Sequence, residues 1–433
     1  MYRLPQPRPQ TSWKSWGGVQ TEEAAREEMA RIGRELASLS APAAFLPVLP
    51  VSSPEQAARV HQGRHDAVLL YACTGSGPLL TACFAPRDTL VFVRHRSGPV
   101  YYWYEALSSR YLGGPGQPHP DDVVVDDYAE LALKLRGLAA ARNLAGTRIV
   151  ALGGAGGKYA AEAPVVAREK LGIEILETGY EAFAPRLRAA RSDAKLAARA
   201  EESARRYLAL PGTSLKTQAA FVTNAFLLHH LFRQLMTEHQ ASAFTIRSCM
   251  STIIPMAETT ACLTLSLMND EGLMAFCESD FVIVPAAILL RHASGLPVFL
   301  HNSTFPHNRM VTCAHCTAPR RMNAREYYPA SILTHYESEY GAAPKVDMPR
   351  GQRVTFINPE YSTLRWLGFR GVVRENPHYE ICRSQQDVEI DGDWQALKAE
   401  ARDSHWVMAA GDHLAAAGYA ARKAGVRWVE LGS

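Results

Sequence analysis

The chain has 433 residues, of which 47% are hydrophobic and 21% are charged, and this length is enough for about two to four domains with buried cores. The net charge is only +3 and the basic residues are dispersed, so the chain has no continuous basic stripe with which to bind a nucleic acid. Two short basic clusters, Arg94-His95-Arg96 and Arg320-Arg321, are expected on solvated faces, with an anionic substrate as the alternative.

The ends and the apolar runs carry no export or membrane signal. Met1 to Trp16 contains Pro, Gln and Arg where a signal peptide needs an apolar core. Phe281 to Leu290 is about half the length of a membrane span and is interrupted by Pro285. Eight cysteines in so long a chain do not make a disulfide framework. We therefore expect a cytoplasmic protein with reduced thiols and no membrane partner.

The first predicted domain, residues 1–145, is an α/β lobe that follows a Pro- and Trp-rich arm ending near Gly18. Thr21 has the features of a helix N-cap, with two glutamates in the turn after it. Helices and short apolar runs then alternate, which predicts a parallel sheet with helices on its faces. The predicted helices are Thr21 to Leu36 and Pro54 to Gln62, and the predicted strands are Phe45 to Val51, Ala67 to Tyr71 and Thr89 to Arg94.

The second predicted domain, residues 146–304, begins with a strand over Thr147 to Leu152 that runs into the glycine-rich segment 153–157. This segment lacks the G-x-G-x-x-G spacing, so we predict a strand-to-helix turn and no cofactor-binding residues. In the alternative, a nucleotide site, Glu177 is the acid that binds ribose. Long helices are predicted over 192–208 and 215–238, and Phe299 to Thr304 ends the domain.

The third predicted domain, residues 305–433, is rich in β-structure. Short strands over 353–358, 363–373 and 387–390 are separated by Pro, Gly and Asn turns, which predicts an antiparallel sheet or small barrel. The final segment, 394–431, has the pattern helix, strand, helix, strand. The predicted fold class is therefore α/β, with two α/β lobes followed by a β-rich, barrel-like domain.

Three sequence motifs contain the residue types that catalysis and metal binding require. Glu278 ends a predicted strand, close to Asp280, and a carboxylate there can bind a hard cation or take a proton beside a carbonyl. His315 lies inside Cys313-Ala314-His315-Cys316, a C-x-x-C pair without the second pair of a zinc finger. We expect buried cysteines beside a histidine that holds substrate or metal. The third motif is Ser404-His405-Trp406.

Together these motifs resemble the L-fucose/L-arabinose isomerase superfamily, in particular its shorter fucose-isomerase-like proteins. The resemblance covers most of the chain from about Leu144 onward. Glu278 is followed by Gly295-Leu-Pro-Val-Phe299 in the register of the family, and Ser404 to Val407 followed by Gly411 matches the histidine strand of its metal site. His315-Cys316 before Pro319 also matches the shorter relatives. The chain departs from the family at Asn302, where the family has an aspartate.

The resemblance implies two flavodoxin-like lobes with a C-terminal β-rich domain, assembled as a homotrimer or homohexamer. It implies a divalent cation, Mn²⁺ in preference to Zn²⁺, bound by Glu278, Asn302 and His405. Asp280, His301 and His315 are the alternatives for the ligand position that Asn302 fills with less charge. The segment Arg94 to Pro99, with Tyr101 to Glu105, is a candidate to enter the active site of a neighbouring subunit.

The leading functional hypothesis is a metal-dependent enzyme that acts on a polyhydroxylated, sugar-like small molecule. Glu278 would remove a proton next to a carbonyl, with Asp280 and His315 as candidates for the second acid or base, giving aldose–ketose isomerisation through an ene-diol. Because Asn302 cannot move protons, a lyase reaction through the same enolate is the variant. The alternatives are a non-catalytic sugar-binding or regulatory protein, and a zinc-dependent thiol enzyme centred on Cys313 and Cys316.

Overall fold

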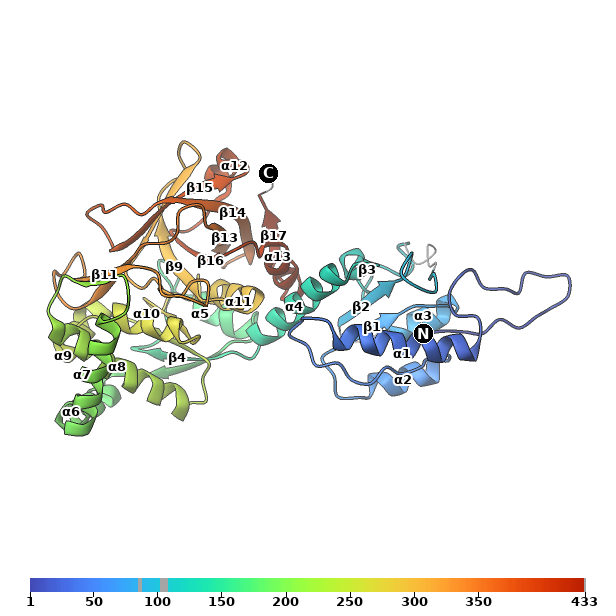
Figure 1. Cartoon of the computed structure of the whole chain (residues 1–433), viewed down its shortest axis with the longest axis horizontal. Helices are drawn as coiled ribbons and strands as arrows, with labels where there is room; N and C mark the ends of the chain where they lie inside the picture. Colours follow the sequence, from blue (N-terminus) through green and yellow to red (C-terminus); the bar gives the residue numbers. More distant parts are fainter. Residues whose placement is uncertain (85–87, 102–107, 432–433) are drawn as a thin grey trace. The chain divides into compact units, whose positions relative to one another are not determined.

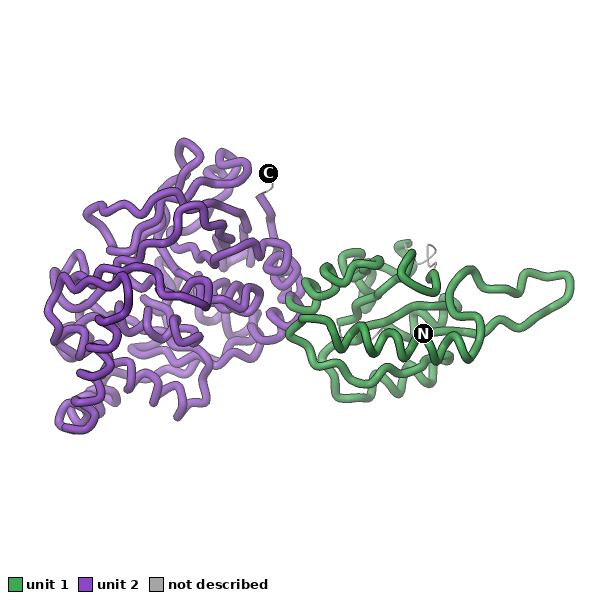
Figure 2. The backbone as a smooth tube through the Cα atoms, viewed as in Figure 1, with its two compact units in different colours: residues 1–136 green, residues 137–433 purple. Residues whose placement is uncertain are grey.

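A computed structural model of the chain describes residues 1–84, 88–101 and 108–431. These residues form two compact units, 1–136 and 137–433 (Figure 2). We predicted a boundary between residues 145 and 146, whereas the units divide within helix α4 (Tyr128–Leu144). The second and third predicted domains both fall in the larger unit.

The smaller unit is built on a parallel sheet in the strand order β1-β2-β3. The predicted helix after Thr21 is confirmed, because the Thr21 hydroxyl accepts a hydrogen bond from the Ala24 amide at 3.1 Å. The elements of this unit are α1 (Glu22–Ala37), α2 (Pro54–His61), β1 (Ala67–Tyr71), α3 (Gly77–Cys83), β2 (Asp88–Val93), the 3₁₀ turn η2 (Pro120–Asp122) and β3 (Val123–Val125).

The predicted strand over Phe45 to Val51 does not form. Pro47 and Pro50 lack the N–H groups that a sheet ladder needs. Leu46 and Leu49 are 62% and 58% exposed, so this apolar segment runs along the surface as irregular chain.

The two basic clusters also differ from expectation, because Arg94 and Arg320 are fully buried. The Arg94 guanidinium lies 2.5 Å from a carboxylate oxygen of Glu28 and 2.5 Å from one of Glu35. Arg320 donates to the Tyr328 carbonyl at 2.9 Å. Arg94 is thus bound within its own unit, and the stretch 102–105 of the segment proposed to reach a neighbouring subunit lies outside the described residues.

The larger unit begins with a second parallel sheet, in the strand order β5-β4-β7-β8, of which β4 is labelled in Figure 1. Helix α8 covers one face of the sheet, where Phe232 stacks on Phe244 with ring centroids 4.4 Å apart. The helix predicted over 192–208 is confirmed as α7, which begins two residues later, after Asp193, whose carboxylate caps it. The elements are β4 (Arg148–Leu152), α5 (Ala163–Glu169), β5 (Glu174–Thr178), α6 (Tyr180–Ser192), α7 (Ala194–Leu208), α8 (Ala219–Glu238), β7 (Ala243–Ile246) and β8 (Met274–Phe276).

Six further strands of the larger unit form a closed antiparallel barrel in the order β13-β16-β9-β10-β15-β14, with β14 pairing back onto β13, while β12, β11 and β6 form a separate small sheet. Figure 1 shows the barrel strands β13, β14, β15 and β16 together. The predicted α/β fold class with a barrel-like C-terminal part is therefore confirmed. The strands are β9 (Val298–Ser303), β10 (Met310–His315), β13 (Arg353–Glu360), β14 (Arg365–Glu375), β15 (Ser384–Asp391) and β16 (His405–Ala410), and β17 (Arg427–Glu430) joins β14 in parallel.

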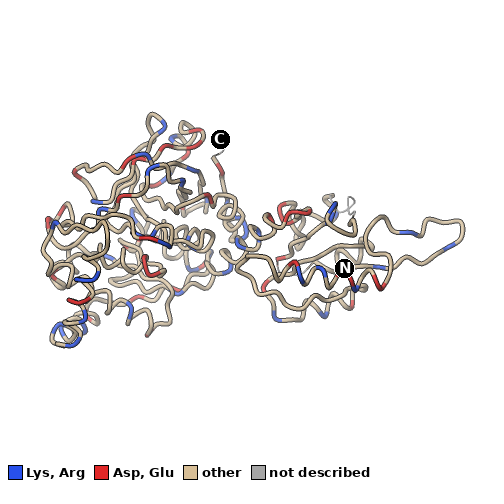
Figure 3. Tube along the Cα trace, in the orientation of Figure 1, with Lys and Arg blue, Asp and Glu red and all other residues tan. Residues whose placement is uncertain are grey.

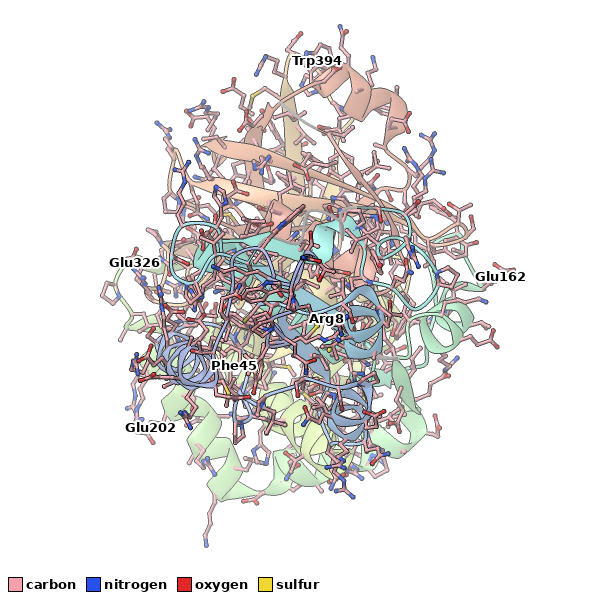
Figure 4. The ribbon with its side chains drawn as sticks, turned by 90° about the vertical axis from the view of Figure 1, so that its right-hand side faces the viewer. Arg8, Phe45, Glu162, Glu202, Glu326 and Trp394 are labelled. Atoms are coloured by element: carbon pink, nitrogen blue, oxygen red, sulfur yellow. The ribbon has the colours of Figure 1, made fainter. Side chains whose placement is uncertain are left out.

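Strand β9 belongs to the barrel, although the predicted second domain extended to residue 304. It pairs with β16 and β10, so the barrel recruits a strand that directly follows the α/β layer. Phe356, Phe369 and Trp406 belong to the buried core of the barrel, and Trp394 packs against the same core. Trp394 begins helix α12 (Trp394–Glu400) and is labelled in Figure 4.

Helix α11 (Val284–Ser294) joins the two layers of the larger unit. It leads from β8 of the parallel sheet into β9 of the barrel, and it packs on β9 and β16. The other elements are β6 (Thr213–Leu215), the π-helical turn η3 (Cys249–Ile253), α9 (Ile254–Ala257), α10 (Cys262–Asp270), β11 (Ala330–Leu333), β12 (Ala343–Val346) and α13 (Leu414–Lys423). This arrangement brings the end of β8 close to the ends of the barrel strands.

Acidic and basic residues are interspersed along the trace of each unit, which agrees with the small net charge (Figure 3). Across the described ranges, each helix is too short or too polar to cross a membrane. All eight cysteines lie in those ranges and are free thiols.

Candidate functional site

Three side chains that the sequence singled out meet where the parallel sheet faces the barrel. Glu278 lies in the turn after β8, His315 is the last residue of β10, and His405 is the first residue of β16. One ligand atom from each lies within 4.8 Å of the other two. The structure thus groups Glu278 with both histidines, although 127 residues of chain separate the first from the last.

Glu278 is held by an unusual turn of the backbone. Glu278 and Ser279 have φ values of 64° and 50°, a left-handed conformation that non-glycine residues rarely adopt. The glycine-rich segment fixes this turn, because the Gly156 amide donates to the Ser279 carbonyl at 3.1 Å and the Gly156 carbonyl accepts from Phe281 at 2.9 Å. Such strain persists only where the surroundings enforce it, and it concentrates at functional sites.

The sequence suggested that Asp280 and Glu278 share one face of a strand. They do not, because both residues follow the end of β8. Its Oδ2 atom lies 2.6 Å from Nδ1 of His405, and both side chains are buried. Its Oδ1 atom accepts hydrogen bonds from the amides of Lys158 and Val282 at 2.9 and 3.1 Å. Asp280 therefore places the imidazole proton on Nδ1 and leaves Nε2 of His405 as an acceptor that faces Glu278.

Lys158 completes the site. Its Nζ atom lies 3.7 Å from Oε2 of Glu278 and 3.4 Å from Nε2 of His405. It follows the glycine-rich segment after β4, so the same loop that fixes the Glu278 turn also delivers this ammonium group. Sequence reasoning identified the turn but missed Lys158, although a loop at the carboxyl end of a parallel strand is a usual position for ligand contacts.

The charge on Glu278 is stabilised by its neighbours. Burial alone would raise the pKa of this carboxyl, but hydrogen bonding to His315 and the charges of His315, His405 and Lys158 lower it to about 2. The side chain is still 43% exposed. Glu278 is therefore an accessible carboxylate at neutral pH, which suits a metal ligand.

The two ring nitrogens of His315 face different neighbours. Its Nε2 atom lies 3.5 Å from Oε1 of Glu278, and its Nδ1 atom lies 3.4 Å from Oγ1 of Thr317 and 3.8 Å from Sγ of Cys316. The ring is buried, which lowers its pKa despite the hydrogen bond to Glu278. A neutral imidazole can coordinate a cation.

Asn302 and His301 point to opposite sides of β9. Asn302 is directly opposite His405 in the ladder between β9 and β16, so these two side chains share the face that carries the site. His301 is opposite Trp406, and its ring lies 5.7 Å from that of Phe356 inside the barrel. Of the alternatives to Asn302 as a ligand, His315 is therefore the one that lies beside Glu278.

Cys313 and Cys316 do not form a pair. Cys313 is buried in the barrel core, while the sulfur of Cys316 lies 3.2 Å from that of Cys262 at the start of α10. The expectation of buried cysteines beside a site histidine holds for Cys316, which adjoins His315.

The donor set of Glu278, His315 and His405 suits a divalent metal. Two imidazoles and one carboxylate are ligands that Zn²⁺, Mn²⁺ and Fe²⁺ share in protein sites. The positive charge of Lys158 lies among these donors, which indicates that the position attracts a cation. Asp280 supplies the carboxylate that commonly orients a metal-binding histidine.

Comparison with protein-family models and with curated proteins finds no match to this chain. The resemblance to sugar isomerases therefore depends on the sequence motifs around Glu278, His315 and His405.

Proposed function

We propose that this protein is a metal-dependent enzyme that acts on a small polyhydroxylated carbonyl compound of the sugar type. Glu278, His315 and His405 would hold the divalent cation. The observation that carries the proposal is the convergence of these three side chains within 4.8 Å, with Asp280 bound to the far nitrogen of His405. Asn302 shares a strand face with His405 and would contribute a neutral oxygen to ligand or substrate.

A bound divalent cation would polarise the substrate carbonyl and so acidify the neighbouring C–H group. The protein's own groups must then move the proton. Glu278 is the acid or base suggested by the sequence, but its low pKa makes it a weak base. Lys158 lies 3.7 Å from it and is a second candidate, because an ammonium group there can donate a proton or hydrogen-bond to a substrate oxygen.

Asp280 is less suited to proton transfer with substrate than the sequence suggested. Both of its oxygens are engaged by His405 and by backbone amides, and its side chain is buried. We assign it the role of positioning His405. Isomerisation therefore needs a second proton carrier from among Lys158 and His315, and cleavage of the same enolate is the variant reaction.

One observation favours the non-catalytic alternative. Lys158 pairs with Glu278 and contacts His405, so an internal cation already balances the carboxylate. In a sugar-binding or regulatory protein this pair would stay in place and no metal would enter. The two functions thus differ in whether a divalent ion displaces Lys158.

The test begins with metal binding. Chelator-treated full-length protein is titrated with Mn²⁺, a cation that carboxylate and imidazole ligands suit, by calorimetry, and about one equivalent is expected to bind. Glu278→Gln and His405→Asn should each weaken binding more than about tenfold. Glu177→Gln is the matched control, since Glu177 is a half-exposed carboxylate that instead contacts the Ala155 amide and Arg168. If no divalent ion binds, the enzyme proposal fails and the non-catalytic alternative is favoured.

The reaction is tested by deuterium exchange. The metal-loaded protein is incubated in D₂O with a panel of pentoses and 6-deoxyhexoses, and incorporation next to the carbonyl is followed by NMR. Exchange that is lost in Glu278→Gln supports an isomerase, while release of a smaller carbonyl fragment supports a lyase. The same preparation, measured by light scattering, tests the expected homotrimer or homohexamer.

A further inference from the structure

A second group of soft donor atoms lies buried in the larger unit, outside the proposed active site. Cys262 is the first residue of α10, Cys316 follows β10, and His335 lies in the loop after β11. Their exposed fractions are 3%, 4% and 5%. Three segments that are distant in the sequence therefore bring two thiols and an imidazole into one water-poor place.

The three donors are close enough to share one ion. The sulfurs of Cys262 and Cys316 are 3.2 Å apart, and one ligand atom of each residue, including a ring nitrogen of His335, lies within 4.8 Å of the others. Zinc–sulfur bonds of about 2.3 Å and zinc–nitrogen bonds of about 2.0 Å fit within such a triangle after small side-chain shifts.

The backbone holds these segments together without a metal. The Leu263 amide donates to the Ala342 carbonyl at 3.1 Å, and the Thr260 hydroxyl donates to the same carbonyl at 2.9 Å. The His335 amide donates to Tyr340 at 2.9 Å, which closes the loop between β11 and β12. The start of α10 and the loop that carries His335 are thus tied to each other.

His335 supplies an independent indication of a ligand. Its Nδ1 atom is buried and has no hydrogen-bond partner among the residues that the structure describes. Leaving such an atom unpaired costs about 1–3 kcal/mol in general, so buried polar atoms are nearly always satisfied.

We propose that Cys262, Cys316 and His335 form a buried zinc site. Thiolate and imidazole are the ligands that Zn²⁺ prefers, and they do not suit Mn²⁺ or Mg²⁺. Zn²⁺ with two thiolates and a neutral imidazole has no net charge, whereas Cu⁺ in the same place would leave one negative charge buried. The charge balance therefore favours a divalent ion over Cu⁺, and the thiolate and imidazole ligands suit Zn²⁺.

This site is not the C-x-x-C pair that the sequence displays. Cys313 points into the barrel core, so the partner of Cys316 is Cys262, which is 54 residues away in the chain. The proposed zinc ligands include none of Glu278, His315 and His405, although the ring of His315 lies 3.8 Å from the sulfur of Cys316.

The test uses Co²⁺ as a spectroscopic probe in the reduced full-length protein. One bound Co²⁺ should give the sulfur-to-cobalt charge-transfer band, and Zn²⁺ should abolish the band by displacing the probe. Cys262→Ser and Cys316→Ser should each weaken Co²⁺ binding more than about tenfold, and His335→Asn should weaken it by a similar factor. Cys313→Ser, a matched change of a buried thiol, should keep the band.

Two further outcomes decide the proposal. Glu278→Gln should leave the charge-transfer band unchanged, which separates this site from the one at Glu278. Absence of the band in the native protein, or its persistence in Cys262→Ser, would overturn the proposal. Isolation of the protein with a Cys262–Cys316 disulfide that reforms in the presence of zinc would overturn it too. Circular dichroism of each variant checks that it has folded.

Discussion

The Nδ1 atom of His405 lies 2.6 Å from Oδ2 of Asp280, and both side chains are buried between the parallel sheet and the barrel. This pair links the turn after β8 to the first residue of β16. It fixes which nitrogen of His405 is protonated and directs Nε2 toward Glu278. The carboxylate thus acts on the site through the histidine.

We expect Asp280→Asn to weaken divalent-metal binding about 10- to 100-fold while leaving Glu278 in place, because the amide cannot favour the same imidazole proton as strongly. Calorimetric titration with Mn²⁺, which the buried thiols do not suit, measures this change. Asp387→Asn is the control, since this carboxylate accepts from Thr312 on the barrel wall. Equal affinities of Asp280→Asn and native protein would contradict the positioning role.

Lys158→Met should have the opposite effect on metal affinity. The substitution removes a positive charge 3.7 Å from Glu278, and a unit charge at about 4 Å costs about 1 kcal/mol in water, so binding should tighten roughly fivefold. Turnover in the deuterium-exchange assay should fall if Lys158 contacts substrate.

Lys170→Met is the control for this charge removal, because Lys170 is exposed at the end of α5. If neither lysine variant binds metal, the lysine is not competing with an ion, and the non-catalytic alternative gains support.

Asp270 should make stability fall as the pH rises from about 4 to about 7. Burial raises the pKa of this carboxyl from 3.8 to about 7, although the Arg321 amide and the neighbouring arginines oppose the shift. Between these values the folded state keeps a proton that the unfolded state has lost, so the free energy of unfolding decreases with pH and is level above the window. The full change is roughly 4 kcal/mol at most.

Asp270→Asn should remove that slope, because the amide does not titrate. Urea unfolding of both proteins at several pH values between about 4.5 and 7.5 provides the measurement. Asp193→Asn, at the exposed N-cap of α7, should keep the native slope. A slope that persists in Asp270→Asn would assign the pH dependence to other groups.

Arg94→Met should destabilise the smaller unit by about 3–5 kcal/mol, since it leaves the buried carboxylate of Glu28 without its partner. Hydrogen exchange of β1 and β2 should become faster by the corresponding factor. By contrast, Arg186→Met breaks an exposed pair with Glu238 and should cost about 1 kcal/mol or less. Similar effects of the two substitutions would count against a structural role for Arg94.

The α/β class and the barrel were predictable because both rest on local patterns. Thr21 with its acidic first turn marks a helix, and short strands between Pro and Gly turns mark the barrel. The assignment of β9 to the barrel was not predictable, because an apolar run such as Val298 to Leu300 fits a buried strand of either sheet equally well.

The candidate site, too, was only partly predictable from the sequence. Glu278, His315 and His405 stood out by residue type and spacing, but their grouping depends on a left-handed turn at Glu278 that sequence patterns do not specify. Lys158 and His335 owe their positions to loops whose closure is set by tertiary hydrogen bonds. Residues of this kind are found only when the fold is known.

The ring of His315 stands between the two proposed centres, with Nε2 toward Glu278 and Nδ1 toward the sulfur of Cys316. A neutral imidazole has a single N–H, so a hydrogen bond donated on one side requires acceptance on the other. A thiol, a thiolate and a zinc-bound sulfur differ in what they offer Nδ1. A change in the chemical state of the sulfur pair would thereby alter the hydrogen bonding of the ring nitrogen that faces the carboxylate.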